Sequence, residues 1–127
     1  YMFSTAMPPL LCAATLAALE IMQTTDIVEQ LQKNISYFQA AMHAHDCNLV
    51  NQDNTAIQPI IVGSSEKALA LTQLAKDAGF WVGCMRPPAV PKDTERLRIT
   101  LRADHTESEL TQLVELIASF EQVNHAA

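Results

Sequence analysis

The order of apolar and polar positions along the chain predicts four helices and three strands. In the second helix, which begins near Asp26, apolar residues recur every three or four positions, the spacing of one face of an α-helix. From Glu95 to Arg102 the pattern changes to strict alternation, as in a strand with one face in the core and the other in solvent. The apolar set expected in the second helix is Ile27, Leu31, Ile35, Phe38 and Met42.

Two prolines and two acidic residues mark where the first two helices begin. Pro8 and Pro9 can occupy the cap and first turn of a helix over residues 10–23, where a missing backbone N–H costs nothing. Asp26 and Glu29 have the spacing of an acidic capping box at the start of the second helix. Small residues on the first helix permit close packing against a neighbour: Ala13, Ala14, Ala17 and Ala18.

Hydroxyl caps mark the third and fourth helices. Ser64 or Ser65 begins the third helix, which ends at Gly79, because glycine easily adopts the backbone conformation that follows a helix. Thr106 and Glu109 form a capping box at the start of the fourth. The apolar residues expected in these two helices are Leu69, Leu71, Leu74 and Ala75, then Leu110, Leu113, Val114, Ile117 and Phe120.

Three strands complete the pattern. Residues 57–62 and 80–85 each predict a short buried strand, and the polar loop over 46–55 has room for a brief one near Leu49. In the third strand, 95–102, the apolar positions share one face and the polar positions the other. These are Leu97, Ile99 and Leu101 on the first face, and Arg96, Arg98, Thr100 and Arg102 on the second.

The order helix, helix, strand, helix, strand, strand, helix describes an α+β domain. We expect a small, mostly antiparallel sheet that is covered by helices on one face. A chain of 127 residues has the size of a single domain, over residues 1–127, and can bury a core of its own.

The net charge of −6 limits the kind of partner. With 14 acidic and 8 basic residues, the chain is not expected to bind nucleic acid or an anionic membrane surface. The first 22 residues are apolar, but they lack a basic start and two prolines interrupt them, so we expect a soluble helix there and no signal peptide. Any anion that binds this chain is expected to be small.

The three cysteines and four histidines suggest neither a disulfide framework nor a metal site. Cys12, Cys47 and Cys84 are widely spaced and odd in number, which fits a reducing cytoplasm. His43 and His45, two residues apart, fall on different sides of a helix, and the other two histidines stand alone. We therefore expect a cytoplasmic protein without a bound metal.

All four arginines fall within residues 80–102, which makes this segment the candidate for binding an anion. Arg86 ends a predicted strand and precedes Pro87 and Pro88, which hold the backbone extended. A guanidinium on such a stiff turn can hold a carboxylate or a phosphate through two parallel hydrogen bonds. The alternative, from residue type alone, is that the arginines form the solvated face of a sheet and pair with surface carboxylates.

Five motifs, in this order and spacing, resemble the carboxyl-terminal part of the α-oxoamine synthases. The resemblance covers essentially the whole chain. The motifs are Phe3-Ser4-Thr5-Ala6-Met7-Pro8-Pro9, Gly79-Phe80-Trp81-Val82, Arg86-Pro87-Pro88-Ala89-Val90-Pro91, Thr94-Glu95-Arg96-Leu97-Arg98-Ile99-Thr100-Leu101 and His105-Thr106.

The resemblance implies an enzyme of the aspartate aminotransferase fold type (fold type I) that uses pyridoxal 5'-phosphate. In such enzymes a large domain carries the cofactor and a small carboxyl-terminal domain, which this chain would be, closes over the substrate. The triplet that begins at Arg86 favours the branch that condenses L-alanine with a pimeloyl thioester, releasing carbon dioxide, in biotin synthesis. Two sister branches, 5-aminolevulinate synthase and glycine C-acetyltransferase, differ at this turn. The family further implies a homodimer with shared active sites.

The resemblance also implies roles for single residues. Arg86 matches the family arginine that holds the amino-acid carboxylate, so that the bond to be broken stands out of the plane of the cofactor. Thr5, and with it Ser4, would reach the cofactor phosphate of the neighbouring subunit, since the start of a helix can bind phosphate. Arg96 and Arg98 match an Arg-Leu-Arg strand of the family and would have a structural role, in buried or interfacial ion pairs.

Two departures limit what the chain can do. Ala89 stands where the family commonly has a threonine associated with substrate contact, which leaves the acyl specificity open. None of the four lysines lies in the motif that binds the cofactor, and the chain starts at Tyr1 inside apolar sequence. We therefore expect a piece of a longer enzyme that is inactive by itself. Without its large domain, an apolar patch near the first helix should be exposed and promote self-association.

Two alternatives stay open. A sister α-oxoamine synthase would use another amino acid or acyl group, and the space beside Arg86 would decide which. A stand-alone module that binds a small anionic metabolite without chemistry would use the same arginine face. In the branch that condenses L-alanine with a pimeloyl thioester, either coenzyme A or acyl carrier protein could carry the thioester.

Overall fold

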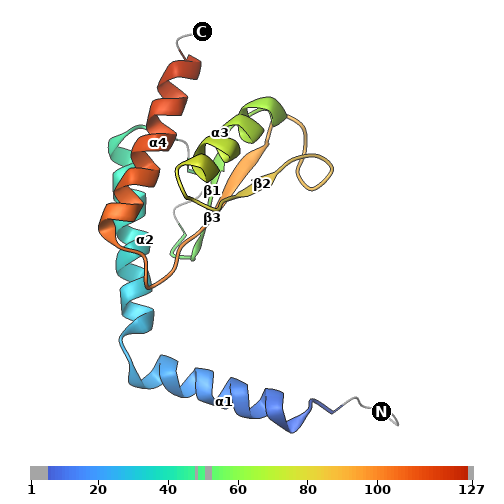
Figure 1. Ribbon diagram of the computed structural model, residues 1–127, viewed down its shortest axis with the longest axis vertical. Coiled ribbons are helices and arrows are strands. Elements are labelled where there is room, and N and C mark those ends of the chain that lie inside the picture. The colour runs from blue at the N-terminus through green and yellow to red at the C-terminus, as the bar shows by residue number, and fades with distance from the viewer. Residues whose placement is uncertain (1–5, 48, 51–52, 126–127) are drawn as a thin grey trace.

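The computed structural model describes residues 6–47, 49–50 and 53–125 and contains four helices and a three-stranded sheet (Figure 1). The helices are α1 (Pro9–Thr24), α2 (Ile27–Ala44), α3 (Ser65–Asp77) and α4 (Glu107–His125). The strands are β1 (Ile57–Ile61), β2 (Gly83–Met85) and β3 (Arg96–Thr100). This order of elements is the one that the sequence pattern predicts.

The sheet is antiparallel, and β3 lies in its centre, in the order β1-β3-β2. β1 pairs with β3 along its whole length. β2 pairs only with the first half of β3, and the last pair on that side is Gly83 opposite Arg98. Thr100, which lies opposite Ile57 of β1, therefore has no strand partner on the β2 side among the described residues.

Helices cover one face of this sheet, as Figure 1 shows for α3 and α4. Burial along β3 follows from this arrangement, because Leu97 and Ile99 are buried while Arg98 and Thr100 are exposed. The expected α+β fold, a small antiparallel sheet covered by helices on one face, is confirmed.

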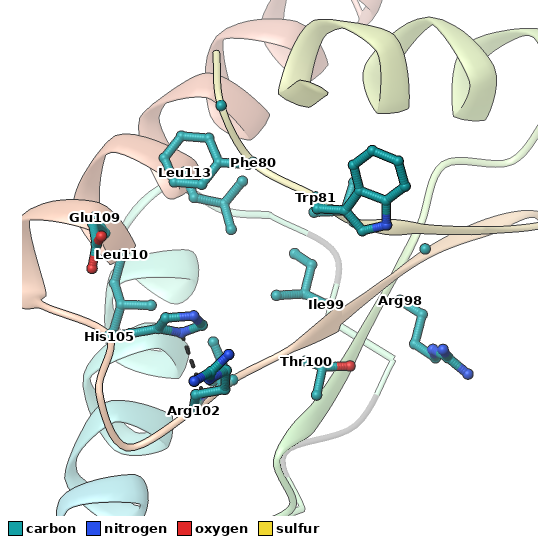
Figure 2. Close-up of a pocket in the computed structure, with 14 residues that line it drawn as sticks. Phe80, Trp81, Arg98, Ile99, Thr100, Arg102, His105, Glu109, Leu110 and Leu113 are labelled. Atoms are coloured by element: carbon teal, nitrogen blue, oxygen red, sulfur yellow. Dashed lines mark hydrogen bonds between the residues drawn. The ribbon is translucent and has the colours of Figure 1, made fainter. Parts of the chain in front are cut away.

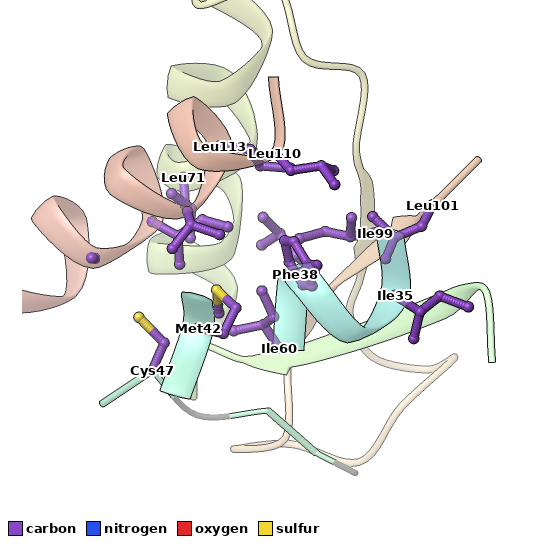
Figure 3. Close-up of a cluster of buried hydrophobic side chains, with 14 of the residues drawn as sticks. Ile35, Phe38, Met42, Cys47, Ile60, Leu71, Ile99, Leu101, Leu110 and Leu113 are labelled. Carbon is purple, nitrogen blue, oxygen red and sulfur yellow. The ribbon is translucent and has the colours of Figure 1, made fainter. Parts of the chain in front are cut away.

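Apolar side chains from α2, α3, α4 and the sheet form one core between the helices and the sheet (Figure 3). Phe38 and Ile35 of α2, Ile60 of β1 and Leu71 of α3 have no exposed surface. In α4 the predicted apolar stripe is confirmed, with four of its members buried and Phe120 half-buried.

Three residues that we expected in the core lie at the surface. Ile27 is 43% exposed, since it occupies the first turn of α2, at the junction with α1 and beyond the end of the core. Leu69 and Leu74 of α3 are 46% and 44% exposed. The buried stripe of α3 consists of Ala68, Leu71 and Ala75, and residues one position away from this stripe are turned about 100° toward the sides of the helix.

The capping predictions have mixed outcomes. The Ser64 hydroxyl accepts a hydrogen bond from the backbone N–H of Lys67 at 3.2 Å, so Ser64 caps α3. Thr106 and Glu109 bond each other's backbone N–H groups, which confirms the capping box of α4. The box expected from Asp26 is wrong, because its backbone (φ −84°, ψ 11°) lacks the extended conformation that a capping side chain needs, and no such bond forms.

Helix α1 extends away from the rest of the chain (Figure 1) and contacts only α2 among the described elements. None of its residues is buried. The patch that we expected near the first helix is therefore present, and its large members are Leu10, Leu11, Leu16, Leu19, Ile21 and Met22. No single described helix has the length and apolar character of a membrane span, and α1 with α2, bent by 68° between them, meets that test only as a pair.

Candidate functional site

Arg86 follows the last residue of β2 and begins the loop that returns to β3. Its carbonyl oxygen accepts hydrogen bonds from the N–H groups of Ala89 (2.9 Å) and Val90 (3.3 Å), so the chain turns sharply after it. The peptide bond between Pro87 and Pro88 is cis. The Arg86 side chain is exposed and has neither a hydrogen bond nor an ion pair to the described residues.

Two of the other arginines are already engaged. The guanidinium of Arg102 donates two hydrogen bonds to the Asp104 carboxylate, from Nε to Oδ1 at 2.9 Å and from Nη2 to Oδ2 at 2.6 Å. These bonds lower the pKa of Asp104. Arg96 donates from Nε to the carbonyl oxygen of Thr94 at 2.9 Å. Among the described arginines, Arg86 and Arg98 are thus the ones whose guanidinium groups form no hydrogen bond within the described residues.

The ion pairs expected for Arg96 and Arg98 do not form within the part of the chain that the structure describes. Arg98 extends from the open face of the sheet (Figure 2), and its strand neighbours are Pro59 and Gly83, which carry no charge. A strand residue pairs most readily with the residue directly opposite, so the sheet offers Arg98 no carboxylate. Ion pairs of these arginines across a subunit interface stay a prediction.

A cavity of about 520 Å³ lies between residues 80–83, the second half of β3 and the start of α4 (Figure 2). Phe80 and Leu110 contribute apolar walls, and Arg102 and His105 contribute polar ones. The Nδ1 atom of His105 accepts a hydrogen bond from the backbone N–H of Arg102 at 3.3 Å. Arg86 does not line this cavity.

The strand that we expected over residues 80–85 is shorter, since only Gly83–Met85 pairs with β3, and the unpaired residues 80–82 line the cavity. Trp81 is 88% exposed, and Nζ of Lys76 lies 5.4 Å from the centre of its ring. The sequence signal for this late start of β2 is Gly83, since glycine inside a strand pattern weakens the pairing. Our sequence reading missed it.

A second cavity, of about 740 Å³, lies where α1 meets α2 and the end of β3. Its lining is mainly apolar and includes Ile21, Met22 and Ile27. It lies against the last turn of the exposed helix α1. It holds none of the residues that we expected to bind substrate or cofactor.

The described residues do not form a site for pyridoxal phosphate. Such a site needs a lysine that can form an imine, and Lys33, Lys67, Lys76 and Lys92 are all exposed and line neither cavity. Ser4 and Thr5, which we expected at the cofactor phosphate, lie outside the described residues. Among the residues described, no three His, Cys, Asp or Glu side chains gather into a group that could hold a metal ion.

Comparison with known proteins agrees with the motifs. The sequence matches the family described as aminotransferase class I and II over residues 1–117. It is 40% identical over 119 residues to the 8-amino-7-oxononanoate synthase of Hydrogenovibrio crunogenus, covering 93% of this chain. The chain spans only 30% of the length of that relative.

Solved structures show the same fold. The 8-amino-7-oxononanoate synthase of Francisella tularensis superposes with a TM-score of 0.83 and 26% identity, over 97% of this chain and 36% of that one. A serine palmitoyltransferase from S. paucimobilis with bound PLP superposes with a TM-score of 0.80 and 23% identity, over 98% of this chain and 32% of that one. Both proteins have the fold type that we expected. The chain therefore belongs to the class I and II aminotransferase family.

Proposed function

We propose that residues 1–127 are the carboxyl-terminal small domain of an enzyme like 8-amino-7-oxononanoate synthase. The complete enzyme would join L-alanine to a pimeloyl thioester, with release of carbon dioxide, as a step of biotin synthesis. The observation that supports this is the free, exposed guanidinium of Arg86 on its proline-flanked turn, in a chain 40% identical to such a synthase.

In this proposal Arg86 binds the carboxylate of the amino acid. Its planar guanidinium can donate two parallel hydrogen bonds, which fix both the position and the orientation of a carboxylate. The three prolines of the loop donate no backbone N–H, and the N–H groups of Ala89 and Val90 already bond to the carbonyl oxygen of Arg86, so few backbone donors compete with its guanidinium. Holding the carboxylate still aligns the bond at the α-carbon that must break.

The rest of the chemistry belongs to parts of the enzyme outside this chain. Pyridoxal phosphate, held there by a lysine, would supply an electron sink for the charge that develops at the α-carbon. Ser4 and Thr5 would bind the phosphate of the cofactor in a second subunit, so the enzyme would be a homodimer. It would act in the cytoplasm. By itself the chain would be inactive.

The decisive experiment compares Arg86→Ala with Arg102→Ala in a longer protein that contains this chain and the lysine-bearing domain. Arg102 is the matched control, because it is an exposed arginine already paired with Asp104. L-alanine is assayed with pimeloyl-CoA and with pimeloyl acyl carrier protein. Loss of the charge-assisted pair should raise KM for L-alanine about tenfold or more in Arg86→Ala and leave it nearly unchanged in Arg102→Ala.

Other outcomes would contradict the proposal in distinct ways. Turnover of glycine or serine in place of L-alanine would assign the chain to a sister synthase. A longer protein that binds no cofactor but still binds small carboxylates would indicate a module without chemistry. Equal kinetics of the two arginine variants would remove Arg86 from the substrate site.

A further inference from the structure

Glu95 is a buried carboxylate at the far end of the loop that Arg86 begins. Its side chain is 3% exposed, and no other Asp, Glu, Lys or Arg of the described residues is buried. Oε1 accepts a hydrogen bond from the hydroxyl of Ser65 at 3.1 Å, while the buried Oε2 has no partner among the described residues. Burying a carboxyl group without a nearby cation costs free energy of folding. If the position served packing alone, an apolar residue there would give a more stable fold.

The surroundings of Glu95 explain how the fold accommodates this polar side chain. Ser65 is the first residue of α3, and the start of a helix carries a partial positive charge that favours a nearby carboxylate. The backbone carbonyl of Glu95 also accepts hydrogen bonds from Val62 (2.8 Å) and Gly63 (3.2 Å). One residue therefore attaches the loop to the end of β1, to the turn after it and to the start of α3.

The rest of the loop has no comparable attachment. Hydrogen bonds of residues 87–93 stay inside the loop: Ala89 and Val90 bond to Arg86, and Thr94 bonds to Pro91 through both its N–H and its hydroxyl. Of residues 86–93, all except Val90 are exposed. Glu95 is thus the first residue on the β3 side through which hydrogen bonds hold the loop against the helical layer.

Arg86 and Glu95 each lie one position beyond the last pair of the hairpin. The last pair of β2 and β3 before the loop is Met85 opposite Arg96, and the next position along each strand is Arg86 and Glu95. A shift of the chain at Glu95 therefore moves the base of the loop at the point where Arg86 leaves the sheet.

We propose that Glu95 is a positioning residue for Arg86, which fixes the proline-rich loop by burying its carboxylate at the start of α3. This inference rests on the proposed role of Arg86 in binding the substrate carboxylate. Glu95 does not touch the substrate. It keeps the guanidinium of Arg86 in the position that binds the substrate carboxylate.

The test uses Glu95→Ala and Glu95→Gln in the longer protein that carries this chain. Glutamine keeps the shape of the side chain and an oxygen that can accept a hydrogen bond from Ser65. Glu95→Gln should therefore behave like the parent, unlike Glu95→Ala. Glu66→Ala is the matched control, because Glu66 lies next to Ser65 in the first turn of α3 and is exposed. Ser65→Ala is the milder variant for use if Glu95→Ala does not fold.

Two readouts are measured. In Glu95→Ala, hydrogen exchange of the amides of Ala89 and Val90 should accelerate about tenfold, because the loop loses its side-chain bond to Ser65 and keeps only the backbone bonds of residue 95. KM for L-alanine should rise about tenfold with kcat within about threefold, the sign of lost substrate binding without lost chemistry. Glu95→Gln and Glu66→Ala should match the parent in both readouts, and Ser65→Ala should change both in the same direction but less.

The proposal is overturned if Glu95→Ala leaves exchange in the loop unchanged, or if exchange accelerates equally throughout α3 and β3, which would mean general loosening. A failure of the proposed function is recognised separately. If Arg86→Ala leaves KM for L-alanine unchanged, Arg86 does not bind the substrate, whereas the exchange readout still reports whether Glu95 anchors the loop.

Discussion

The side-chain nitrogen of Asn34 lies 2.8 Å from the carbonyl oxygen of Arg102, a contact that joins the middle of α2 to the turn before α4 across 68 residues of sequence. The same Nδ2 also donates to the carbonyl oxygens of Ala103 (3.3 Å) and His105 (2.9 Å). Asn34 is itself 3% exposed. One buried amide thus sets the path of the chain between β3 and α4, beside the cavity of Figure 2.

Replacing Asn34 by alanine should therefore destabilise the protein strongly. Carbonyl groups of the turn would lose their donor, which costs about 1–3 kcal/mol for a buried group. Urea unfolding measures the change in the free energy of unfolding. Gln73→Ala, on the exposed side of α3, should change it by less than about 0.5 kcal/mol. Equal stabilities of the two variants would show that the turn does not depend on Asn34.

The capping box of α4 gives a second prediction. The Thr106 hydroxyl accepts from the N–H of Glu109 at 3.3 Å, and the Glu109 carboxylate accepts from the N–H of Thr106 at 2.8 Å. Thr106→Ala should lower the free energy of unfolding by about 1 kcal/mol, as is typical for loss of a helix cap. Thr106→Ser, which keeps the hydroxyl, is the control and should stay close to the parent.

The same box predicts a dependence on pH. The hydrogen bond from the backbone N–H of Thr106 is the main cause that lowers the pKa of Glu109 below its ordinary value of 4.5. A carboxyl with a lowered pKa stabilises the fold above its ordinary pKa, and this stabilisation is lost as the pH falls through the lowered value. Stability measured from pH 6 downward should therefore decline less in Glu109→Gln than in the parent. Parallel curves for the two proteins would contradict this.

The cysteines should differ sharply in reactivity. Burial, followed by the charge of Glu121 and a hydrogen bond to it, raises the pKa of Cys47 to about 12, whereas Cys12 is exposed on α1. Because the thiolate is the reactive form, a maleimide at pH 8 should label Cys12 about 100-fold faster than Cys47. Mass spectrometry of peptides from a time course measures both rates.

The raised pKa of Cys47 also affects stability. The contribution of its neutral thiol to the stability of the fold is complete below pH 9 and is lost as the pH rises toward 12.

The exposed face of α1 should cause self-association. Leu10 and Leu16 are 79% and 68% exposed on a helix that has no buried residue. Apolar patches of this kind favour association, so sedimentation velocity should show species larger than a monomer as concentration rises. Replacing both leucines by lysine should restore the monomer, whereas Leu74→Lys, at a leucine of α3 that is 44% exposed, should not. A parent that stays monomeric at high concentration would contradict the prediction.

Periodicity predicted most of the fold, and its one overlooked consequence concerns Glu95. The alternation that places Leu97, Ile99 and Leu101 on the core face also places Glu95 there, because it lies two positions before Leu97. Residue type alone argues against burying a carboxylate, and only the start of α3, brought close by the fold, makes the position tolerable. The alternation and the residue type thus gave opposite expectations for Glu95, and the alternation was right, because the fold places the start of α3 beside it.

Contacts between distant segments account for what the sequence did not predict. Nothing near Asn34 in the sequence announces a turn 68 residues away that needs its amide. The exposure of Trp81 depends on where β2 begins to pair with β3, which Gly83 only suggests. The role proposed for Arg86 rests on the resemblance to a family, since an exposed arginine on a turn is by itself an ordinary surface residue.

The short pairing of β2 has a consequence for solubility. Beyond Gly83 no described strand pairs with the backbone of Thr100 on that side, and such an open edge is a template for aggregation with strands of other chains. The edge is only a few residues long, and the charged side chain of Arg98 extends beside it. Two copies brought edge to edge would bring like charges together, which natural sheets use to prevent this kind of growth.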